Sequence, residues 1–256
     1  MHVETLRRYP VKSMLGEELA ETEVTERGLA GDRARAVLDV ATGKIASAKN
    51  PRLWRRLLTL EGARAPGDAE LSELLGREVR LIDVPPEGAE MLRSVPEQVL
   101  AEGIEAEVPY TVSPVGAGAP EGTFFDFAPV HLITTSALAR IGALGPRGHV
   151  EAERYRPNLV IATEDDGDEG FVENGWVERR LRVGDEVELH VIVATPRCAV
   201  PTLAHGALER DTDALRTVAR HNRVPVFGME PQPCAGVYAR VTRPGRIRVG
   251  DPVTVV

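Results

Sequence analysis

The chain has 256 residues with 31 basic and 39 acidic side chains, and its formal net charge of −8 argues against nucleic acids and anionic membranes as partners. This length can enclose a full hydrophobic core in one large domain or two small ones. The apolar runs are too short for a transmembrane helix, the N-terminal residues lack the apolar stretch of a secretory signal, and two cysteines suit a reduced compartment, so we expect a cytoplasmic protein.

The first third of the chain is a succession of short strands. Apolar and β-branched residues alternate loosely with polar ones between turn residues, a pattern typical of a small β-barrel or sandwich. The expected strands cover residues 3–11, 19–24, 35–39, 45–48 and 77–84. Two helices are also expected, one at 50–54 that begins with Asn50-Pro51 and one at 68–75 that ends before Gly76.

A change of composition separates the two halves. Residues 113–123 contain three glycines and two prolines, which is typical of a loop or linker. We therefore expect two domains, residues 1–112 and 113–256. The acidic run 164–169 lacks the spacing of a calcium loop and is expected to be solvated. In this half the pattern predicts strands at 130–134 and 159–162 and helices at 135–144 and 211–221.

A short internal repeat extends the β pattern to the end of the chain. Residues 181–189 and 247–255 share a frame in which an apolar residue precedes Arg-Val-Gly-Asp and alternation follows. Each copy predicts a tight Gly-Asp turn between two paired strands. The expected fold class is therefore mainly β, within the α+β class, with two β-barrel-like domains and a few helices.

Residues 190–202 contain the most reactive pair of side chains. The β-branched run that begins here predicts a buried strand, which must end at Pro196 because proline cannot donate to a sheet ladder. Arg197 and Cys198 follow on the turn, where functional side chains are often displayed. Taken alone, an isolated cysteine is more often a small buried hydrophobic residue.

Basic and hydroxyl groups gather at three other turns. Arginine or lysine beside a serine hydroxyl and backbone amides can hold a phosphate through charge-assisted hydrogen bonds, although each cluster alone is more simply surface charge. The sequence has no Walker motif, dinucleotide-binding glycine motif, nucleophile elbow or zincin histidine spacing. The three clusters are Lys12-Ser13, Arg33 after Gly31-Asp32, and Arg154-Tyr155-Arg156-Pro157-Asn158.

Together these stretches resemble the MOSC proteins. The segments 9–13 (YPVKS), 28–33 (GLAGDR) and 50–52 (NPR) look like the N-terminal β-barrel domain of that family. The MOSC domain itself is resembled by Arg156-Pro157-Asn158, Trp176, Arg182-Val183-Gly184, Arg197-Cys198 and the closing segment 245–251 (GRIRVGD). The resemblance covers nearly the whole chain in order. Within the family, the chain is similar to the molybdenum-cofactor enzymes that include the mitochondrial amidoxime-reducing components and their bacterial relatives.

The resemblance implies a molybdenum cofactor in its molybdopterin form. In the family the cysteine of the Arg-Cys pair ligates molybdenum, so Cys198 is the implied metal ligand and catalytic residue, with Arg197 favouring its thiolate. Groups from both domains would hold the pterin phosphate between the two barrels. The implied cofactor-binding residues are Lys12, Ser13, Arg33, Thr135, Ser136, Arg154, Arg156, Asn158, Arg197 and Thr202. Of the two threonines and the Asp-Pro that usually follow the cysteine in relatives, this chain keeps only Thr202.

The implied activity is the reduction of small N-oxygenated compounds such as hydroxylamines or amidoximes, independent of pyridoxal phosphate. Two cysteines cannot hold a four-cysteine iron–sulfur cluster, so a separate flavoprotein, ferredoxin or cytochrome would donate the electrons. Two alternatives remain open: a sulfur carrier with a persulfide on Cys198, and a MOSC module that performs no catalysis. His205 could act as an acid near Cys198, but a surface histidine is the simpler expectation.

Overall fold

A computed structural model describes residues 1–163 and 170–256, and the acidic run 164–169 lies outside the described residues. Short strands predominate and helices are few, which confirms the mainly β fold class. The strands are β1 (His2–Arg8), β2 (Glu17–Leu19), β3 (Glu21–Thr25), β4 (Gly28–Leu29), β5 (Ala36–Asp39), β6 (Val79–Ile82), β7 (Glu90–Ser94), β8 (Tyr110–Pro114), β9 (Val130–Thr134), β10 (Leu159–Ala162), β11 (Arg180–Val183), β12 (Val187–Pro196), β13 (Arg223–Val224), β14 (Gln232–Arg243), β15 (Gly245–Arg248) and β16 (Val253–Val255). The α-helices are α1 (Pro51–Trp54), α2 (Asp68–Leu75), α3 (Pro96–Glu102), α4 (Thr135–Leu144) and α5 (Asp213–His221).

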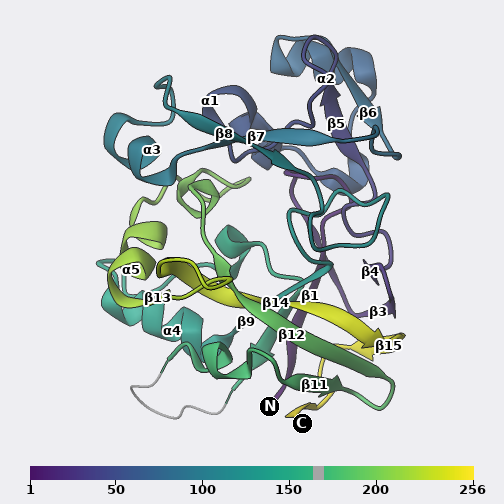
Figure 1. The fold of residues 1–256 in the computed structure, drawn as a ribbon, viewed down its shortest axis with the longest axis vertical. Helices are drawn as coiled ribbons and strands as arrows, with labels where there is room; N and C mark the ends of the chain where they lie inside the picture. The colour runs from purple at the N-terminus through teal and green to yellow at the C-terminus, as the bar shows by residue number, and fades with distance from the viewer. Residues whose placement is uncertain (164–169) are drawn as a thin grey trace.

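The largest sheet runs in the order β16-β11-β12-β14-β9-β10-β1-β2, and β13 pairs with β14 off this path. It occupies the lower part of Figure 1, with α4 and α5 at one side. The strand pairs β5–β6 and β7–β8 lie above it together with α1, α2 and α3. Within the described part of the chain these sheets do not close into a barrel. None of the described helices has the length and apolar character needed to cross a membrane.

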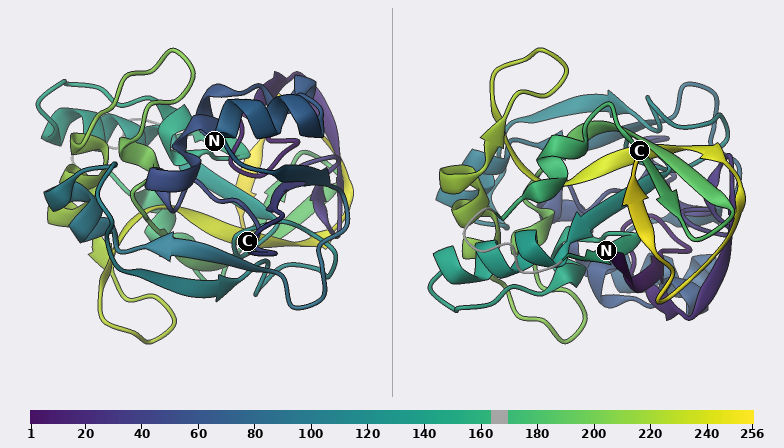
Figure 2. Two further views of the ribbon diagram at one scale, coloured as in Figure 1. Left: turned by 90° about the horizontal axis from the view of Figure 1, so that it is seen from above. Right: turned by 90° about the horizontal axis from the view of Figure 1, so that it is seen from below.

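Strands from the beginning of the chain are built into the sheets of the second half. β1 pairs with β10, with Leu6 opposite Leu159, and β3 pairs with β15, with Thr22 opposite Ile247. The two ends of the chain consequently lie near each other, at the bottom of Figure 1. In the view from above, α2 and the strand pair β7–β8 lie nearest the viewer, in front of the strands of the large sheet (Figure 2, left). A division into residues 1–112 and 113–256 stays a prediction.

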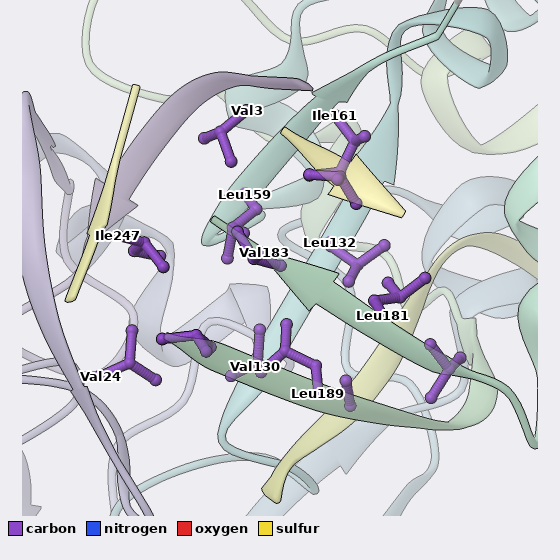
Figure 3. Packing of buried hydrophobic residues seen from close by; sticks show 14 of the residues in the cluster. Val3, Val24, Val130, Leu132, Leu159, Ile161, Leu181, Val183, Leu189 and Ile247 are labelled. Atoms are coloured by element: carbon purple, nitrogen blue, oxygen red, sulfur yellow. The ribbon is translucent and has the colours of Figure 1, made fainter. Parts of the chain in front are cut away.

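The main hydrophobic core is enclosed by the strands of the large sheet and by β3 and β15 (Figure 3). Alternate residues of β11 and β12 point inward because side chains alternate between the faces of a strand, which buries Leu181 and Leu189. All five residues of β9 are buried, as expected for a strand covered on both faces. Leu132 on β9 lies opposite Leu159 on β10, and both are in this core.

Replacing Leu132 by alanine should lower the free energy of unfolding by about 2–5 kcal/mol, because the fully buried side chain leaves a cavity that the two-sided sheet cannot close. Urea unfolding measures the loss. Val249→Ala is the control, since Val249 is 47% exposed and its replacement should change stability by about 0.5 kcal/mol or less. Similar small losses for both variants would contradict the placement of Leu132 in the core.

A buried carboxyl group makes the stability depend on pH. Glu173, in the short 3-10 helix Val172–Trp176, is fully buried, and its Oε2 accepts a hydrogen bond from Thr134 Oγ1 at 2.6 Å. Burial raises the pKa of Glu173 to about 7, and the hydrogen bond from Thr134 only partly opposes this rise. A glutamate in the unfolded chain has a pKa of about 4.3. Between about pH 4.3 and pH 7, Glu173 is therefore protonated in the folded state and ionised in the unfolded state. The contribution of the protonated Glu173 to the free energy of unfolding is fully present below about pH 4.3 and is lost as the pH rises through 7.

We expect the difference in the free energy of unfolding between the wild type and Glu173→Gln to change by about 3 kcal/mol between pH 4 and pH 8, because the variant lacks the Glu173 contribution. Urea unfolding at several pH values within this range measures it for the wild type and the variant. Glu70→Gln on the exposed face of α2 should keep the wild-type profile. A Glu173→Gln profile as steep as that of the wild type would contradict the assignment.

Most of the elements expected in the second half are confirmed. The hairpin predicted from the internal repeat is confirmed only in the first copy. β11 and β12 form the predicted hairpin, with Val183 opposite Val187. The second hairpin is wrong, because β15 pairs with β3 while β16 pairs with β11. Pro252, which has no amide N–H for a hairpin ladder, stands in the second copy where the first has Glu186. The expected strand at 45–48 is likewise reduced to single bridges of Ile45.

Candidate active site

A cavity of about 720 Å³ lies between the large sheet and the upper layer of the molecule. Its walls come from the ends of β12 and β14, from β9, from the residues after β1, and from the antiparallel strand pair β7–β8. The structure brings seven of the predicted site residues together in these walls. They are Lys12, Ser13, Arg33, Arg156, Asn158, Arg197 and Cys198.

Cys198 is presented just beyond the end of β12. The strand pairs with β14 as far as Pro196, which lies opposite Cys234, and the turn to Cys198 follows directly. Cys198 is 7% exposed and lies in the cavity wall, whereas Cys234 is fully buried in a different cluster and is not in that wall. Both cysteines are free thiols, and burial raises the pKa of Cys234 to about 11. Such burial is typical of a cysteine that acts as a small hydrophobic residue in the core.

The Arg197 side chain is fixed on three sides. Its backbone N–H donates to Pro233 O at 2.8 Å, and one end of its guanidinium donates to Tyr155 O at 2.8 Å. The guanidinium also lies 5.3 Å from the centre of the Tyr155 ring and meets His131 Nε2 at 3.4 Å. Its Nε is buried without a hydrogen-bond partner among the described residues. Arg197 therefore keeps one buried donor that no described residue uses.

Two lysines share one carboxylate in the cavity wall. Lys12 Nζ donates to Asp126 Oδ1 at 2.6 Å and to Phe124 O at 2.9 Å, and Lys49 Nζ lies 3.1 Å from the same Asp126 oxygen. Burial lowers the pKa of Lys12 to about 8, although Asp126 opposes the change. Burial alone would raise the pKa of Asp126, but the two ammonium groups outweigh it and hold that pKa well below its usual range.

Two arginines stack against the ring of Tyr9. The Tyr9 side chain is buried, with 2% of its surface exposed. The guanidinium carbons of Arg33 and Arg156 lie 4.6 Å and 4.3 Å from the ring centre. Arg33 is ion-paired with the buried Asp32, whereas the Arg156 guanidinium donates to Met14 O at 2.7 Å and to no carboxylate among the described residues. Burial, the largest cause, lowers the pKa of Arg156 to about 10. Arg156 thus contributes a cation that no described carboxylate neutralises by a direct ion pair.

Asn158 connects the two halves of this wall. Its Nδ2 donates to Asp32 Oδ2 at 3.0 Å, and its Oδ1 accepts a hydrogen bond from the backbone N–H of His131 at 3.1 Å. Asp32 also accepts from the backbone N–H of Tyr9 at 2.6 Å. Asn158 is therefore largely occupied in holding Arg33 and the start of β9 in place.

Four predicted cofactor-binding residues lie elsewhere. Thr135 and Ser136 at the start of α4 hydrogen-bond Thr163, through Thr135 Oγ1 at 3.2 Å and Ser136 N at 3.2 Å. Arg154 is 1% exposed and is held by Glu151 at 2.6 Å, and the Thr202 hydroxyl donates to Ala199 O at 2.7 Å. None of the four belongs to the described cavity wall.

The two histidines nearest this region are both buried. Burial and the nearby Arg197 hold the pKa of His131 well below its usual range, so its ring in the cavity wall is neutral at physiological pH. The expectation that His205 lies on the surface is wrong, because the turn that pairs it with Leu208 leaves it 3% exposed. Burial lowers the pKa of His205 to about 4, and the residue does not line the cavity.

Sequence reasoning missed several residues of the wall, among them Asp126, His131, Phe127 and Tyr238. Asp126 carried a usable signal, since it is a single acid within the run Phe124-Phe125-Asp126-Phe127 that follows the glycine-rich linker. An acid among aromatic residues is rarely a solvated one and so needs a cationic partner. The other three carried no such signal, because aromatic and histidine side chains in strands and in the loops beside them are ordinary.

Family profiles and curated relatives match both parts of the chain. The MOSC domain profile matches residues 120–254, and the profile of the MOSC N-terminal beta barrel domain matches residues 1–74. Mitochondrial amidoxime reducing component 2 of Rattus norvegicus is 26% identical over 279 residues, covering 96% of this chain and 80% of that protein. Mitochondrial amidoxime-reducing component 1 of Homo sapiens is 25% identical over 280 residues with the same coverage.

Among solved structures, the YUAD protein from Bacillus subtilis aligns over 99% of this chain and 93% of its own, with a TM-score of 0.49 and 12% identity. The MOSC domain profile alone covers more than half of the 256 residues. The chain belongs to the MOSC domain family.

Proposed function

We propose that the chain is a molybdenum-cofactor-dependent oxidoreductase that reduces N-hydroxylated compounds with electrons from a separate donor protein. The names of its relatives support a reductase of amidoximes. The observation that carries the proposal is the position of Cys198 in the wall of a cavity rich in cations. Six cationic side chains and two carboxylates line this cavity in the described part of the chain.

The residues present fit an anionic cofactor with a metal. Cys198 would supply a thiolate, a soft ligand suited to molybdenum bound by dithiolene sulfurs. Lys12, Lys49 and Arg156 would hold the phosphate through charge-assisted hydrogen bonds. The Ser13 hydroxyl accepts a hydrogen bond from Ala48 N at 3.1 Å, which leaves its own hydrogen available for a phosphate oxygen. The buried Nε of Arg197 is a further donor without a partner among the described residues.

When bound, the cofactor would supply a metal that accepts the substrate oxygen and passes on two electrons. The chain itself would orient the site through Arg197, which is fixed by Tyr155 and meets His131. The neutral His131 ring can accept a hydrogen bond from Arg197 without adding another charge. The strand pair β7–β8 would exclude water on the side of the cavity opposite the large sheet, since Met91 on β7 and Thr111 on β8 line the cavity.

The overall reaction breaks the N–O bond of the substrate. It consumes two electrons and two protons and releases the reduced nitrogen compound and water. The electrons must come from another protein of the flavoprotein, ferredoxin or cytochrome class, because two cysteines cannot hold a four-cysteine cluster. Reduction of an N-hydroxylated substrate by the isolated chain with NADPH alone would contradict the need for a separate donor.

The proposal is tested by metal analysis of the chain purified from a host that makes molybdenum cofactor. We expect near-stoichiometric molybdenum, and reduction of benzamidoxime when an artificial electron donor is supplied. Absence of both molybdenum and pterin would overturn the proposal. In that case mass spectrometry of Cys198 would detect the extra sulfur atom that the alternative function, a persulfide carrier, requires.

A further inference from the structure

Four aromatic rings form a continuous row along the cavity wall. The ring centres of Phe227 and Phe127 are 4.9 Å apart, and those of Phe127 and Tyr238 are 5.7 Å apart. Tyr238 continues the row to His131 at 5.5 Å. The planes of successive rings are inclined by 49° to 57°, the tilted arrangement that aromatic pairs prefer. All four residues line the cavity, so the row is a wall of the candidate site.

The outer end of the row is apolar and open to solvent. Phe227 is 57% exposed, and so is Met229 two residues later in the loop between β13 and β14. Phe227 has a φ of +53°, a conformation that a bulky L-residue rarely adopts and that costs free energy. An exposed ring held at the cavity mouth by a strained backbone is available for contact with a ligand.

The inner end of the row is polar. No described residue forms a hydrogen bond with the Tyr238 hydroxyl, and burial raises the pKa of this group to about 12, with Asp126 adding to the rise. His131, the last ring, meets Arg197 at 3.4 Å, and Arg197 precedes Cys198 in the chain. The row therefore runs from apolar rings at the mouth to the Tyr238 hydroxyl and to His131, which contacts Arg197, in the same cavity wall as Cys198.

We infer that Phe227, Phe127 and Tyr238 form a subsite for the aromatic ring of an N-hydroxylated substrate, an inference that rests on the proposed function. The substrate ring would pack on Phe227 and Phe127 at the mouth. Its N–O group would then point inward, toward the Tyr238 hydroxyl and Cys198. The chemical class selected is N-hydroxylated compounds whose nitrogen-bearing carbon is attached to an aromatic ring, in preference to those that carry a methyl group there.

The test compares Phe227→Ala with Tyr110→Ala. Tyr110 is an aromatic residue of nearly equal exposure, 54%, but it does not line the cavity. The probes are benzamidoxime and acetamidoxime for turnover, and their products benzamidine and acetamidine for equilibrium binding by calorimetry. We expect the ratio of kcat/KM for benzamidoxime over acetamidoxime to fall about tenfold in Phe227→Ala, with a matching fall in benzamidine affinity. Tyr110→Ala should keep the wild-type ratio and affinity.

Phe227→Leu serves as a second variant, since it keeps apolar bulk without a ring and should lose part of the preference. The subsite is overturned if the wild type binds benzamidine no better than acetamidine, or if Phe227→Ala keeps the wild-type preference. Reduction of both amidoximes without ring selectivity would contradict the subsite alone. Ring-selective binding by a protein that contains no molybdenum and reduces neither amidoxime would overturn both the assignment of the ring to a substrate and the proposed function.

Discussion

Cys198→Ala should abolish the reduction of N-hydroxylated substrates, with a fall in kcat/KM of at least about 100-fold. The bound is reasonable because the loss of groups that merely support metal ligands already costs about 10- to 100-fold in activity or metal affinity. The thiol lies in the wall of the cavity, 7% exposed, so its removal changes the proposed metal site directly. Molybdenum content and the reduction rate with an artificial donor measure the effect.

The other cysteine provides a matched control. Cys234 is fully buried and lies outside the cavity wall, so Cys234→Ala removes a thiol of the same kind from a different environment. It should retain molybdenum and the reduction rate, although it can lower thermal stability. Thermal unfolding shows whether each variant is folded. A Cys198→Ala protein that keeps wild-type activity would refute the role of this thiol.

Lys12→Met should weaken the binding of an anion in the cavity by about 30-fold or more. Removing one member of a buried, hydrogen-bonded charge pair costs about 2 kcal/mol or more, which corresponds to that factor. Titration calorimetry of the cofactor-free chain with inorganic phosphate measures the affinity, and molybdenum content measures retention of the cofactor. Lys44→Met is the control, since Lys44 pairs with Glu90 at the surface and does not line the cavity.

The pKa of Lys12 gives the same experiment a second result. Burial lowers this pKa to about 8, and a bound anion would raise it by favouring the ammonium form. Below pH 8 the charge is already present and the Lys12 contribution to phosphate affinity should be constant. Above pH 8 that contribution should weaken by up to about tenfold per pH unit in the wild type, and this slope should be absent from Lys12→Met. Identical pH profiles for the two proteins would contradict Lys12 as an anion ligand.

The sequence predicted the elements that local pattern determines. The alternating and β-branched runs gave β9 and β10, and the capping residues around 68–75 gave α2, because both signals arise from neighbouring residues. Partners of strands were not predictable in this way. The Gly-Asp frame occurs at 181–189 and 247–255, yet only the first copy forms a hairpin, since pairing with β3 decides the course of β15.

The residues of the candidate site also fall into those that the sequence predicts and those that only the fold brings together. Resemblance and turn chemistry predicted Lys12, Arg156 and Cys198, whose charges and thiol are conspicuous in the sequence, and the structure places all three in one cavity. Tyr238 could not be placed, because its importance comes from what it faces across the fold. Whether the seven residues in the wall bind the cofactor remains a prediction for the variants described above.

The pairing of β3 with β15 also has a consequence for synthesis. Residues 21–25 complete their sheet only with residues 245–248, and Val3 donates its backbone N–H to Asp251 O. Strands that emerge first from the ribosome must therefore wait with unpaired edges until nearly the whole chain has been made. Contacts of such large sequence separation slow folding and leave partly folded chains open to aggregation.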